Sequence, residues 1–331
     1  MDGGVRMQVS VVNRSQIDKK VFRLEAEFYT SNIFTSNEYF IGEQIIELSQ
    51  YNSIYGLNDK GKGYPVLRMN EFNSIFTGKP TIHSEEFSPD AFLVYSLKKG
   101  DILICRTNGN PKLVGKSALV AKDCPYVYES HLFKIRPINK LINSAALVVY
   151  LNTKYGKMEI EKYSMQGNQA NFSLAKFKEM RIPKFAVKFN NSIEELVFLS
   201  FKYLRSSEDS YSKAQNILLS EFRLSHWQPK HTLSFVRKYS EAERAERLDA
   251  EYFQPMYDKI IGVIKKYKHG WDTIGNQFKS NKKVFQIAPD KTYRYVEIGS
   301  VDVSNGSIEP DILAGYFGWK RTSSKRKNCS C

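Results

Sequence analysis

Apolar residues recur every seven positions over a stretch in the middle of the chain. Two such rows lie next to each other: Val197, Leu204, Tyr211 and Leu218 in one, and Leu196, Tyr203, Ile217 and Leu224 in the other, which Ser210 interrupts. This spacing predicts a coiled-coil-type helix of about thirty residues, with an apolar stripe that can lie against a partner helix. Ser192 and Glu195 form the capping-box pattern that begins such a helix, and His-Trp-Gln-Pro at 226–229 ends it. An ordinary core helix has the same periodicity, but polar residues on the opposite side favour an exposed helix.

The chain before this helix mixes short apolar runs with helical periods, which is typical of an α+β domain. We expect strands at 45–48, 66–69, 101–105 and 117–121. Helices are expected at 25–40 and 143–155, and Ser173 caps a third, short helix that stops before Pro183. The connecting loops carry many polar and basic side chains.

A seven-residue segment occurs twice in the chain. Residues 23–29 are Arg-Leu-Glu-Ala-Glu-Phe-Tyr, and residues 247–253 are Arg-Leu-Asp-Ala-Glu-Tyr-Phe. Each copy is followed by a strand-like apolar run bounded by turn residues, at 64–70 and at 293–299. Two matches in the same order indicate a duplicated domain, because the period is too long for a solenoid.

The repeat and the helix together divide the chain into three parts. We expect a first domain at 17–188 and a helical spacer at 189–228. A linker, the start of a second, similar domain and a basic tail occupy 229–331.

The balance of charge favours a polyanionic partner. Lysine and arginine number 49 and aspartate and glutamate 35, which gives a net charge of +14. Such an excess favours DNA, RNA or an anionic membrane, and a merely soluble basic protein is the alternative. No apolar stretch approaches the roughly 20 residues that span a bilayer, and the N-terminus lacks a signal-peptide core. With four scattered cysteines, the chain is expected to be cytoplasmic and reduced, without a membrane partner.

Motifs that carry catalytic chemistry are missing from the sequence. Residues 109–117 resemble a phosphate-binding P-loop, but five residues rather than four separate Gly109 from Gly115, and Pro125 leaves no room for the following helix. The five histidines are isolated, and neither a zinc motif, a nuclease signature nor a methyltransferase motif is present. We therefore expect a protein without enzymatic activity, cofactor or metal.

Several segments then occur in an order typical of one protein family. Residues 100–106, Gly-Asp-Ile-Leu-Ile-Cys-Arg, followed by Val-Gly-Lys at 114–116, resemble the core of a target recognition domain in the specificity (S) subunit of type I restriction-modification systems. Residues 166–174, leading to Arg-Ile-Pro at 181–183, resemble the segment that closes such a domain, and residues 211–220 resemble the conserved helical spacer. The two copies of the seven-residue repeat match the starts of the two recognition domains.

The resemblance implies a sequence-specific DNA-binding subunit. Two recognition domains, held apart by antiparallel helices, would each recognise half of a bipartite site in double-stranded DNA. The helices would dock methyltransferase (M) subunits, and the complex would recruit restriction (R) motor subunits. The length of the spacer helix would set the gap between half-sites.

The chain departs from the family pattern in its last part. Residues 247–331 are about half of what the first domain uses, and they hold no second core segment or closing segment. We expect a second domain shortened by truncation or frameshift, with a natural disordered basic tail as the alternative. Function would then need self-dimerisation through the spacer helix, or the chain would be an inactive specificity subunit.

The polar loops of the first domain supply the candidate DNA contacts. Basic side chains suit phosphates or guanine edges, and amides make paired hydrogen bonds to adenine. The candidates are Arg68, Asn70, Arg106, Asn108, Asn110, Lys112, Lys116, Gln166, Asn168, Gln169 and Asn171. Turn formation or helix capping is the alternative role of the asparagines.

Other functions stay open at this point. The chain would also fit the specificity domain of a fused restriction enzyme, a non-catalytic protein-interaction scaffold whose basic surface is incidental, or an RNA-binding protein. Salt-sensitive DNA binding separates the first hypothesis from the scaffold, because phosphate neutralisation gives a steep dependence on salt.

Overall fold

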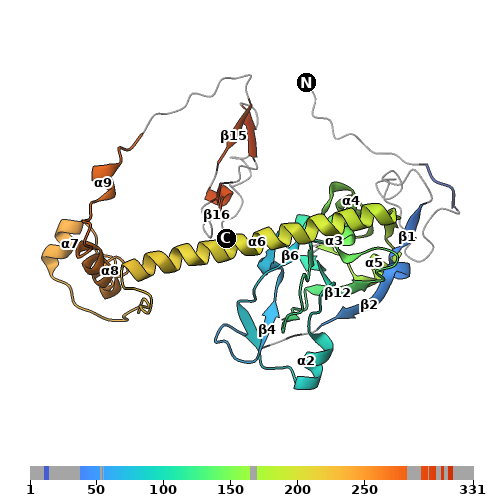
Figure 1. Ribbon diagram of the computed structural model, residues 1–331, viewed down its shortest axis with the longest axis horizontal. Helices are drawn as coiled ribbons and strands as arrows, with labels where there is room; N and C mark the ends of the chain where they lie inside the picture. Colours follow the sequence, from blue (N-terminus) through green and yellow to red (C-terminus); the bar gives the residue numbers. More distant parts are fainter. Residues whose placement is uncertain are drawn as a thin grey trace. The chain divides into compact units, whose positions relative to one another are not determined.

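The computed structural model describes residues 11–14, 38–52, 54, 56–164, 170–281, 292–296, 298–302, 307–308 and 312–315 (Figure 1). The chain forms two compact units, residues 1–205 and 206–331. The boundary between them falls inside one long helix, α6 (Val187–Glu221).

A six-stranded sheet lies at the centre of the first unit. Its order is β2 (Ile46–Tyr51), β12 (Leu132–Pro137), β8 (Ile102–Cys105), β10 (Ser117–Leu119), β6 (Phe76–Thr77) and β5 (Phe72–Asn73). The first four strands are antiparallel neighbours, and β6 joins β10 in parallel. All four residues of β8 are buried, as expected of a strand covered on both faces.

Among the described residues of this unit, a second sheet and two small ladders accompany the central sheet. The second sheet has the order β11 (Val127–Tyr128), β4 (Tyr64–Leu67), β7 (Ile82–Ser84) and β3 (Leu57–Asn58). One ladder pairs β1 (Tyr39–Ile41) with β14 (Arg181–Pro183), and the other pairs β9 (Thr107–Asn108) with β13 (Ala170–Asn171). The ladders join segments that are far apart in the sequence.

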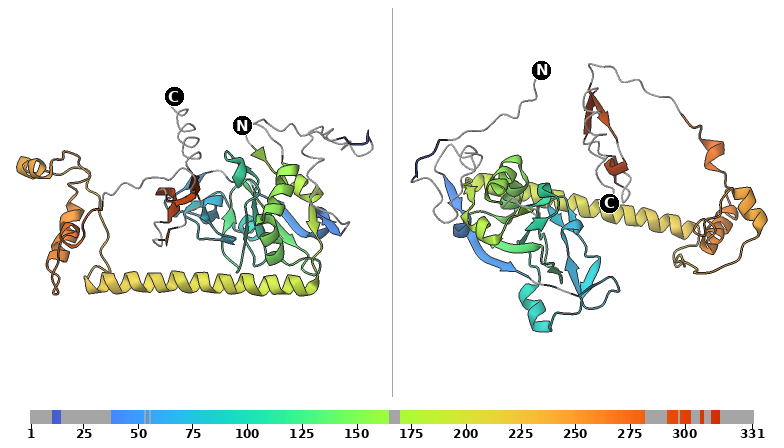
Figure 2. Two further views of the ribbon diagram at one scale, coloured as in Figure 1. Left: turned by 90° about the horizontal axis from the view of Figure 1, so that it is seen from above. Right: turned by 180° about the vertical axis from the view of Figure 1, so that it is seen from behind.

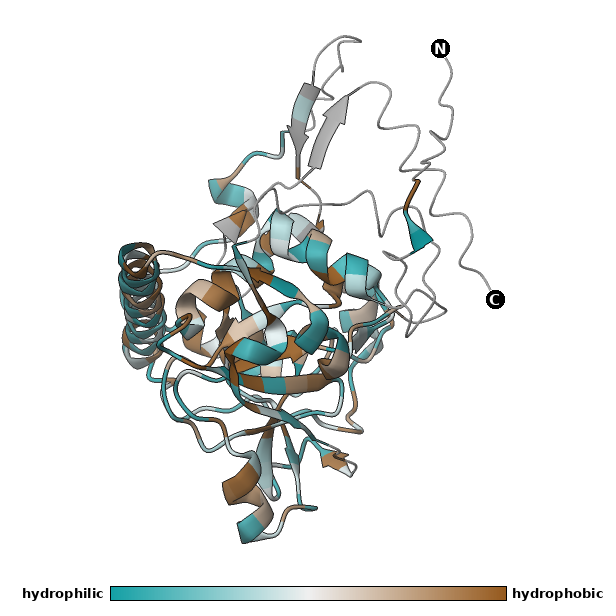
Figure 3. Cartoon of the chain, turned by 90° about the vertical axis from the view of Figure 1, so that its right-hand side faces the viewer, coloured by the Kyte–Doolittle hydropathy of each residue, from teal (hydrophilic) through white to brown (hydrophobic). Residues whose placement is uncertain are grey.

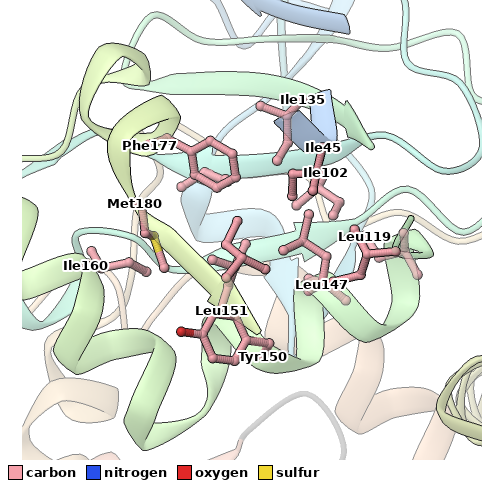
Figure 4. Packing of buried hydrophobic residues seen from close by; sticks show 14 of the residues in the cluster. Ile45, Ile102, Leu119, Ile135, Leu147, Tyr150, Leu151, Ile160, Phe177 and Met180 are labelled. Atoms are coloured by element: carbon pink, nitrogen blue, oxygen red, sulfur yellow. The ribbon is translucent and has the colours of Figure 1, made fainter. Parts of the chain in front are cut away.

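Helices cover one face of the central sheet and form the main core with it. They are α3 (Ser144–Asn152), α4 (Lys154–Tyr163), α5 (Leu174–Glu179) and the first half of α6. Ile102, Ile135, Leu147 and Phe177 are fully buried in this core (Figure 4). Figure 3 shows apolar residues concentrated at the centre of the first unit and polar residues on many of its outer loops.

The alternation of side chains along β8 divides the core in two. Ile102 and Ile104 face the helices, whereas Leu103 and Cys105 belong to a second cluster on the opposite side of the sheet. Such an alternation follows from the two-residue period of a strand. The described part of the unit also contains the shorter α2 (Pro89–Tyr95) and the 3-10 turns η2 (Gly42–Ile45), η3 (Met69–Glu71) and η4 (Pro111–Leu113).

The α+β architecture and the predicted strands are confirmed, with ends shifted by a few residues. The helix expected at 143–155 is two helices, α3 and α4, because Thr153 is extended and its hydroxyl accepts a bond from the amide of Gly156. Ser173 caps α5 as predicted. Of the helix expected at 25–40, residues 25–37 lie outside the described residues, and its end was wrong because Tyr39–Ile41 is strand β1.

The spacer helix is confirmed, and its details differ from the prediction. α6 spans 35 residues and is straight and unbroken (Figure 2). The proposed capping box at Ser192 was wrong, because the helix begins at Val187 and Ser192 lies within it. Val197 is buried against the core and Leu204 packs beside it, whereas Leu196 and Tyr203 of the second row are 62% and 66% exposed. The first apolar row, together with Ile193, Phe198 and Phe201, therefore holds α6 to the domain.

Short helices follow α6 in the second unit. They are α7 (Tyr239–Ala245), α8 (Pro255–Lys265) and α9 (Ile274–Gln277). Tyr267 packs on Phe222 and donates a hydrogen bond to Glu221 at 3.2 Å. Buried Gln254 accepts from the amide of Thr232 at 2.9 Å. None of the helices in the described ranges is long and apolar enough to cross a membrane.

The strands of the second unit repeat an order of elements found in the first unit. In the first, β4 is followed by η3, by the antiparallel hairpin β5–β6, and by β7, which pairs back on β4. In the second, β15 (Thr292–Tyr295) is followed by η5 (Ile298–Ser300), by the antiparallel hairpin of β16 (Val301–Asp302) and β17 (Ser307–Ile308), and by β18 (Ile312–Gly315), which pairs back on β15.

The paired strands are also separated by similar lengths of chain in the two copies. Tyr64 faces Ser84 in the first unit, and Tyr293 faces Ala314 in the second. The duplication found in the sequence thus has a counterpart in the fold. The first copy of the seven-residue repeat, 23–29, lies outside the described residues, and the boundaries at 17, 188 and 228 stay predictions.

Candidate nucleic-acid interface

Four strand ends of the central sheet meet at one edge and bring polar side chains together there. Tyr51 ends β2, Arg106 follows β8, Lys116 precedes β10 and His131 precedes β12. Because these strands are antiparallel, the ends are neighbours: the amide of Arg106 donates to the carbonyl of His131 at 2.7 Å, and that of Cys105 donates to Lys116 at 2.9 Å. We call this end of the sheet, with its four residues, the recognition edge.

Asp101 holds the strand that leads to this edge. Its fully buried carboxylate accepts from the amide of Lys98 at 2.9 Å and pairs with the guanidinium of Arg136 at 2.7 Å. Lys134, also buried, lies 3.9 Å from the same carboxylate. Burial lowers the pKa of Lys134, and the adjacent Asp101 opposes that shift. Asp101 of the Gly-Asp motif therefore links the start of β8 to β12 through buried ion pairs.

Arg106 is the arginine of the recognition edge. Its guanidinium lies 5.3 Å from the centre of the Tyr51 ring, and its Nε is buried without a hydrogen-bond partner in the described part of the chain. An unmet buried donor costs about 1–3 kcal/mol, and a cation–π contact at such a site returns about 0.5–1 kcal/mol. The contact with Tyr51 thus positions the Arg106 side chain, and its Nε–H can donate to an acceptor on a bound molecule.

Asn171 presents an unmet acceptor on the adjoining ladder. It faces Thr107 in the pairing of β13 with β9, and the amide of Phe172 donates to the carbonyl of Arg106 at 2.8 Å. The Oδ1 of Asn171 is buried, and it finds no hydrogen-bond partner among the residues described. The closing segment is therefore joined directly to the loop after β8.

The glycine loop between β9 and β10 is a chain of tight turns. Asn108 Oδ1 accepts from the amide of Asn110 at 2.8 Å, and Asn110 caps η4 by accepting from the amide of Lys112 at 3.1 Å. Gly115 has φ +79°, and a Cβ there would lie 2.6 Å from Ile160 Cγ2. The side-chain oxygens of both asparagines are thus used in turn formation, which was the alternative role.

This loop is not a phosphate-binding P-loop. The residues after it form strand β10 instead of a helix, so the amide nest and helix N-terminus that hold a phosphate are not formed. Lys112 is exposed, and the Lys116 ammonium lies 6.0 Å from the ring of Phe72. No ion pair engages either lysine within the described ranges.

Arg68 and Asn70 differ in how far they are engaged. The Arg68 guanidinium pairs with Glu71 at 2.9 Å and donates to Thr81 at 3.0 Å. Burial alone would raise the pKa of Glu71, but the hydrogen bonds from Arg68 and Thr81 outweigh it and the pKa lies below its usual value. The charge of Arg68 is therefore largely compensated, whereas Asn70 is exposed in η3.

The sequence interpretation missed three residues near these candidates. Tyr51 and His131 belong to the recognition edge, and Glu129 lies in the same turn as His131, 3.7 Å away. Glu129 accepts from the amide of Met69 at 3.3 Å, and burial raises its pKa. The signal for this turn was the polar run 129–131 between two apolar strands. The candidates Gln166, Asn168 and Gln169 lie outside the described residues.

Comparison with known proteins gives one family match. Residues 26–184 match the model of the type I restriction modification DNA specificity domain. This segment, just under half of the chain, is therefore similar to that domain. The match covers the central sheet, the recognition edge and the closing segment. Among curated proteins, none matches this chain.

Solved structures of the type I system also match at low identity. The HsdS subunit from Thermoanaerobacter tengcongensis shares 16% identity, with 51% of this chain and 38% of that chain covered and a TM-score of 0.35. The S subunit from M. genitalium shares 12%, with 58% and 46% covered and a TM-score of 0.38. A chain from work on complex assembly and conformational transition of the type I R-M system shares 13%, with 57% and 44% covered and a TM-score of 0.37. The matched region is less than half of each of these chains.

Proposed function

We propose that this chain is a DNA-binding specificity subunit that acts in the cytoplasm and catalyses no reaction. The first unit recognises one half of a bipartite site, and the recognition edge contacts the bases. The observation that carries this proposal is Arg106, whose partly buried guanidinium stacks on Tyr51 and keeps a buried donor unmet. Arginine is the commonest reader of guanine, because its fork matches O6 and N7.

The surrounding residues support contact with a duplex. Lys112 and Lys116 follow Arg106 on the glycine loop and supply charges for the phosphates. Exposed Asn70, and Asn171 with its unmet oxygen, suit the edges of adenine or cytosine. The net charge of +14 favours the same partner, because phosphate neutralisation dominates affinity for DNA.

The proposed protein partners are the M and R subunits of a type I complex. α6 is the proposed docking element for M subunits and for a second copy of the chain. Tyr211, Ile217 and Leu218 in its second half are 46%, 72% and 58% exposed, which is the pattern of a helix that lacks its partner. With 35 residues, the helix is about 52 Å long, and this length would set the spacing of half-sites.

Selection from a randomised 30-base-pair duplex pool tests the DNA-binding proposal. The intact chain should enrich one short motif containing guanine, and Arg106→Ala should lose the preference at that guanine. Arg106→Lys should restore affinity for DNA but not the preference for guanine. Lysine keeps the positive charge, but it lacks the two parallel N–H donors of the guanidinium. Lys140→Ala is the matched control, since Lys140 is exposed and lies beyond the opposite end of β12. If Arg106→Ala selected the same motif as the parent chain, the proposal that Arg106 recognises a guanine would be wrong.

Co-expression with a type I M subunit tests the proposed partners. Adenine methylation at a bipartite motif should appear in plasmid DNA only when this chain is present. A palindromic motif would show two copies acting together. Failure of the two proteins to co-purify, together with DNA retention that does not depend on salt, would favour the protein-interaction scaffold instead.

A further inference from the structure

The turn between β11 and β12 places a carboxylate beside the recognition edge. The turn has the sequence Glu-Ser-His, and the amide of Leu132, which begins β12, donates to the carbonyl of Glu129 at 3.1 Å. Leu132 pairs with Cys105 in the antiparallel ladder of β12 and β8. His131 therefore lies opposite Arg106, and Glu129 is two residues further along the chain. The carboxylate is thus a near neighbour of the arginine that is proposed to recognise guanine.

Contacts on two sides fix the position of Glu129. Its amide donates to the carbonyl of Leu67 at 3.0 Å, and its Oε1 accepts from the amide of Met69 at 3.3 Å. The side-chain amide of Asn108, on the loop that follows Arg106, donates to Met69 Sδ at 3.7 Å. Glu129 and the loop after β8 therefore both contact Met69, the first residue of η3.

The second carboxylate oxygen of Glu129 keeps its capacity to accept a hydrogen bond. Within the described ranges, the hydrogen bond to the carboxylate goes to Oε1. Oε2 lies 3.7 Å from Nδ1 of His131, beyond hydrogen-bond distance. The side chain is 17% exposed, so it is within reach of a bound molecule. An ionised carboxylate accepts hydrogen bonds and donates none.

The fold alone does not favour a carboxylate at this position. Burial raises the pKa of Glu129, and the amide of Met69 and the neighbouring His131 oppose that rise only in part. Keeping the side chain ionised therefore costs stability in the free protein. Side chains that the fold does not favour are typical of functional sites.

The bases differ in what their major-groove edges offer to a carboxylate. Guanine presents acceptors there, and thymine presents an acceptor and a methyl group, whereas cytosine and adenine each present an amino group. The amino group of adenine lies next to the acceptor N7, which repels a carboxylate, so cytosine is the best partner.

We infer that Glu129 recognises the N4 amino group of a cytosine in the half-site that the first unit binds. This inference rests on the proposed DNA-binding function and adds a second residue that determines specificity. Neighbouring strands lie about 4.8 Å apart, and two residues span at most about 7 Å. At about 3.4 Å for each base-pair step, the cytosine belongs to a second G·C pair within about four steps of the guanine that Arg106 recognises.

The duplex selection proposed for Arg106 tests this inference with two further variants. The parent chain should specify a second G·C pair besides the one that Arg106 recognises. Glu129→Gln should replace the cytosine by adenine, because an amide makes paired hydrogen bonds to N6 and N7 of adenine. Glu129→Ala should leave that position unspecified. Both variants should keep the guanine that is lost in Arg106→Ala.

Fluorescence anisotropy with two duplexes measures the size of the effect. One duplex carries the selected motif, and the other carries adenine in place of the cytosine, with thymine opposite. The parent should prefer the first duplex by at least about fivefold, the usual effect of one mismatched pair. Glu129→Ala should bind both duplexes equally, and Glu129→Gln should prefer the second.

Glu43→Gln is the matched control for these variants. The exposed carboxylate of Glu43 precedes the end of β2 that is opposite the recognition edge. This variant should therefore keep the motif of the parent and its preference between the two duplexes. Circular dichroism checks that all variants fold, and Glu129→Gln keeps an acceptor for the amide of Met69.

The result separates this inference from the DNA-binding proposal. If the parent selected no motif, both would be wrong. If Arg106→Ala lost its guanine while both variants of Glu129 kept every position of the parent motif, the inference about Glu129 alone would be wrong. It would also be wrong if both variants lost the guanine of Arg106, because Glu129 would then support the shape of the edge and contact no base.

Discussion

Two carboxylates of the first unit, the buried Asp101 and the partly buried Glu129, differ in how their surroundings compensate them. Asp101 receives two positive partners and a backbone amide, so its burial is compensated. Burial raises the pKa of Glu129, and the hydrogen bond from the amide of Met69 offsets that effect only in part. The free energy of unfolding should therefore depend on pH through Glu129.

Replacement of Glu129 by glutamine tests this dependence. A carboxyl group whose pKa is raised on folding contributes stability that is complete below its unfolded pKa and is lost as the pH rises through the folded value. Glu129→Gln stays neutral and keeps an acceptor for the amide of Met69. The variant should thus be more stable than the parent at neutral pH, and the difference should vanish at low pH. Urea denaturation at several pH values measures it.

Glu43→Gln serves as the control for that series. Glu43 is exposed and forms a loose pair with Lys178 at 3.9 Å, so its replacement should change stability little at any pH. A Glu129→Gln variant that is less stable than the parent at pH 7 would show that the ionised carboxylate stabilises the fold.

Among the elements, the break between α3 and α4 depends on the close approach of two backbones. A Cβ on Gly156 would lie 2.1 Å from the carbonyl oxygen of Tyr150. Helix propensity alone favours alanine over glycine by about 1 kcal/mol. Because the clash is with backbone, we expect the steric cost to outweigh propensity, and Gly156→Ala should lower the free energy of unfolding.

Gly262 supplies the matched case for this prediction. It lies inside α8, where a Cβ would meet nothing within 4 Å. Gly262→Ala should raise the stability of the second unit by about 0.5–1 kcal/mol. Thermal unfolding of both variants compares them. If Gly156→Ala and Gly262→Ala changed stability equally, the turn at Thr153 would be able to shift and accommodate the added Cβ of residue 156.

These elements also show which parts of the fold the sequence predicts. The strand at Ile102–Cys105 and the helix α6 were found because apolar runs and seven-residue rows are local signals. The start of α6 was missed because Ser192 matches a cap locally while the helix continues back to Val187. The two ladders were not predicted in detail, since their pairs lie far apart in the chain and pairing leaves little trace in local composition.

The same limit applies to the candidate site. Arg106 and Asn171 were listed for the hydrogen-bonding chemistry of their side chains on polar loops, and the structure places them on adjoining segments. Their contact with DNA stays a prediction. Tyr51 was missed because its contact with Arg106 depends on the register of β2 against β12, which lies between β2 and the strand that precedes Arg106. Arg68 was listed for its charge alone, and its pairing with Glu71 became visible only in the fold.

At the scale of the whole molecule, the excess positive charge should govern affinity for any DNA, whereas the recognition edge should govern preference. The logarithm of the binding constant should fall linearly with the logarithm of salt concentration. Lys112→Ala combined with Lys116→Ala removes two charges beside Arg106. The slope should become shallower by about 1.8, since each phosphate contact contributes about 0.9, and the selected motif should stay the same.

The double variant Lys122→Ala, Lys140→Ala separates local from total charge. Both lysines are exposed and lie beyond the ends of β10 and β12 that point away from the recognition edge. This variant has the same net charge as the first one, so a slope set by total charge would fall equally in both. A slope reduced only by the loss of Lys112 and Lys116 would show that the duplex lies along the recognition edge, because counterions are released only where phosphates meet the protein. Fluorescence anisotropy from low to moderate salt gives both slopes on one duplex.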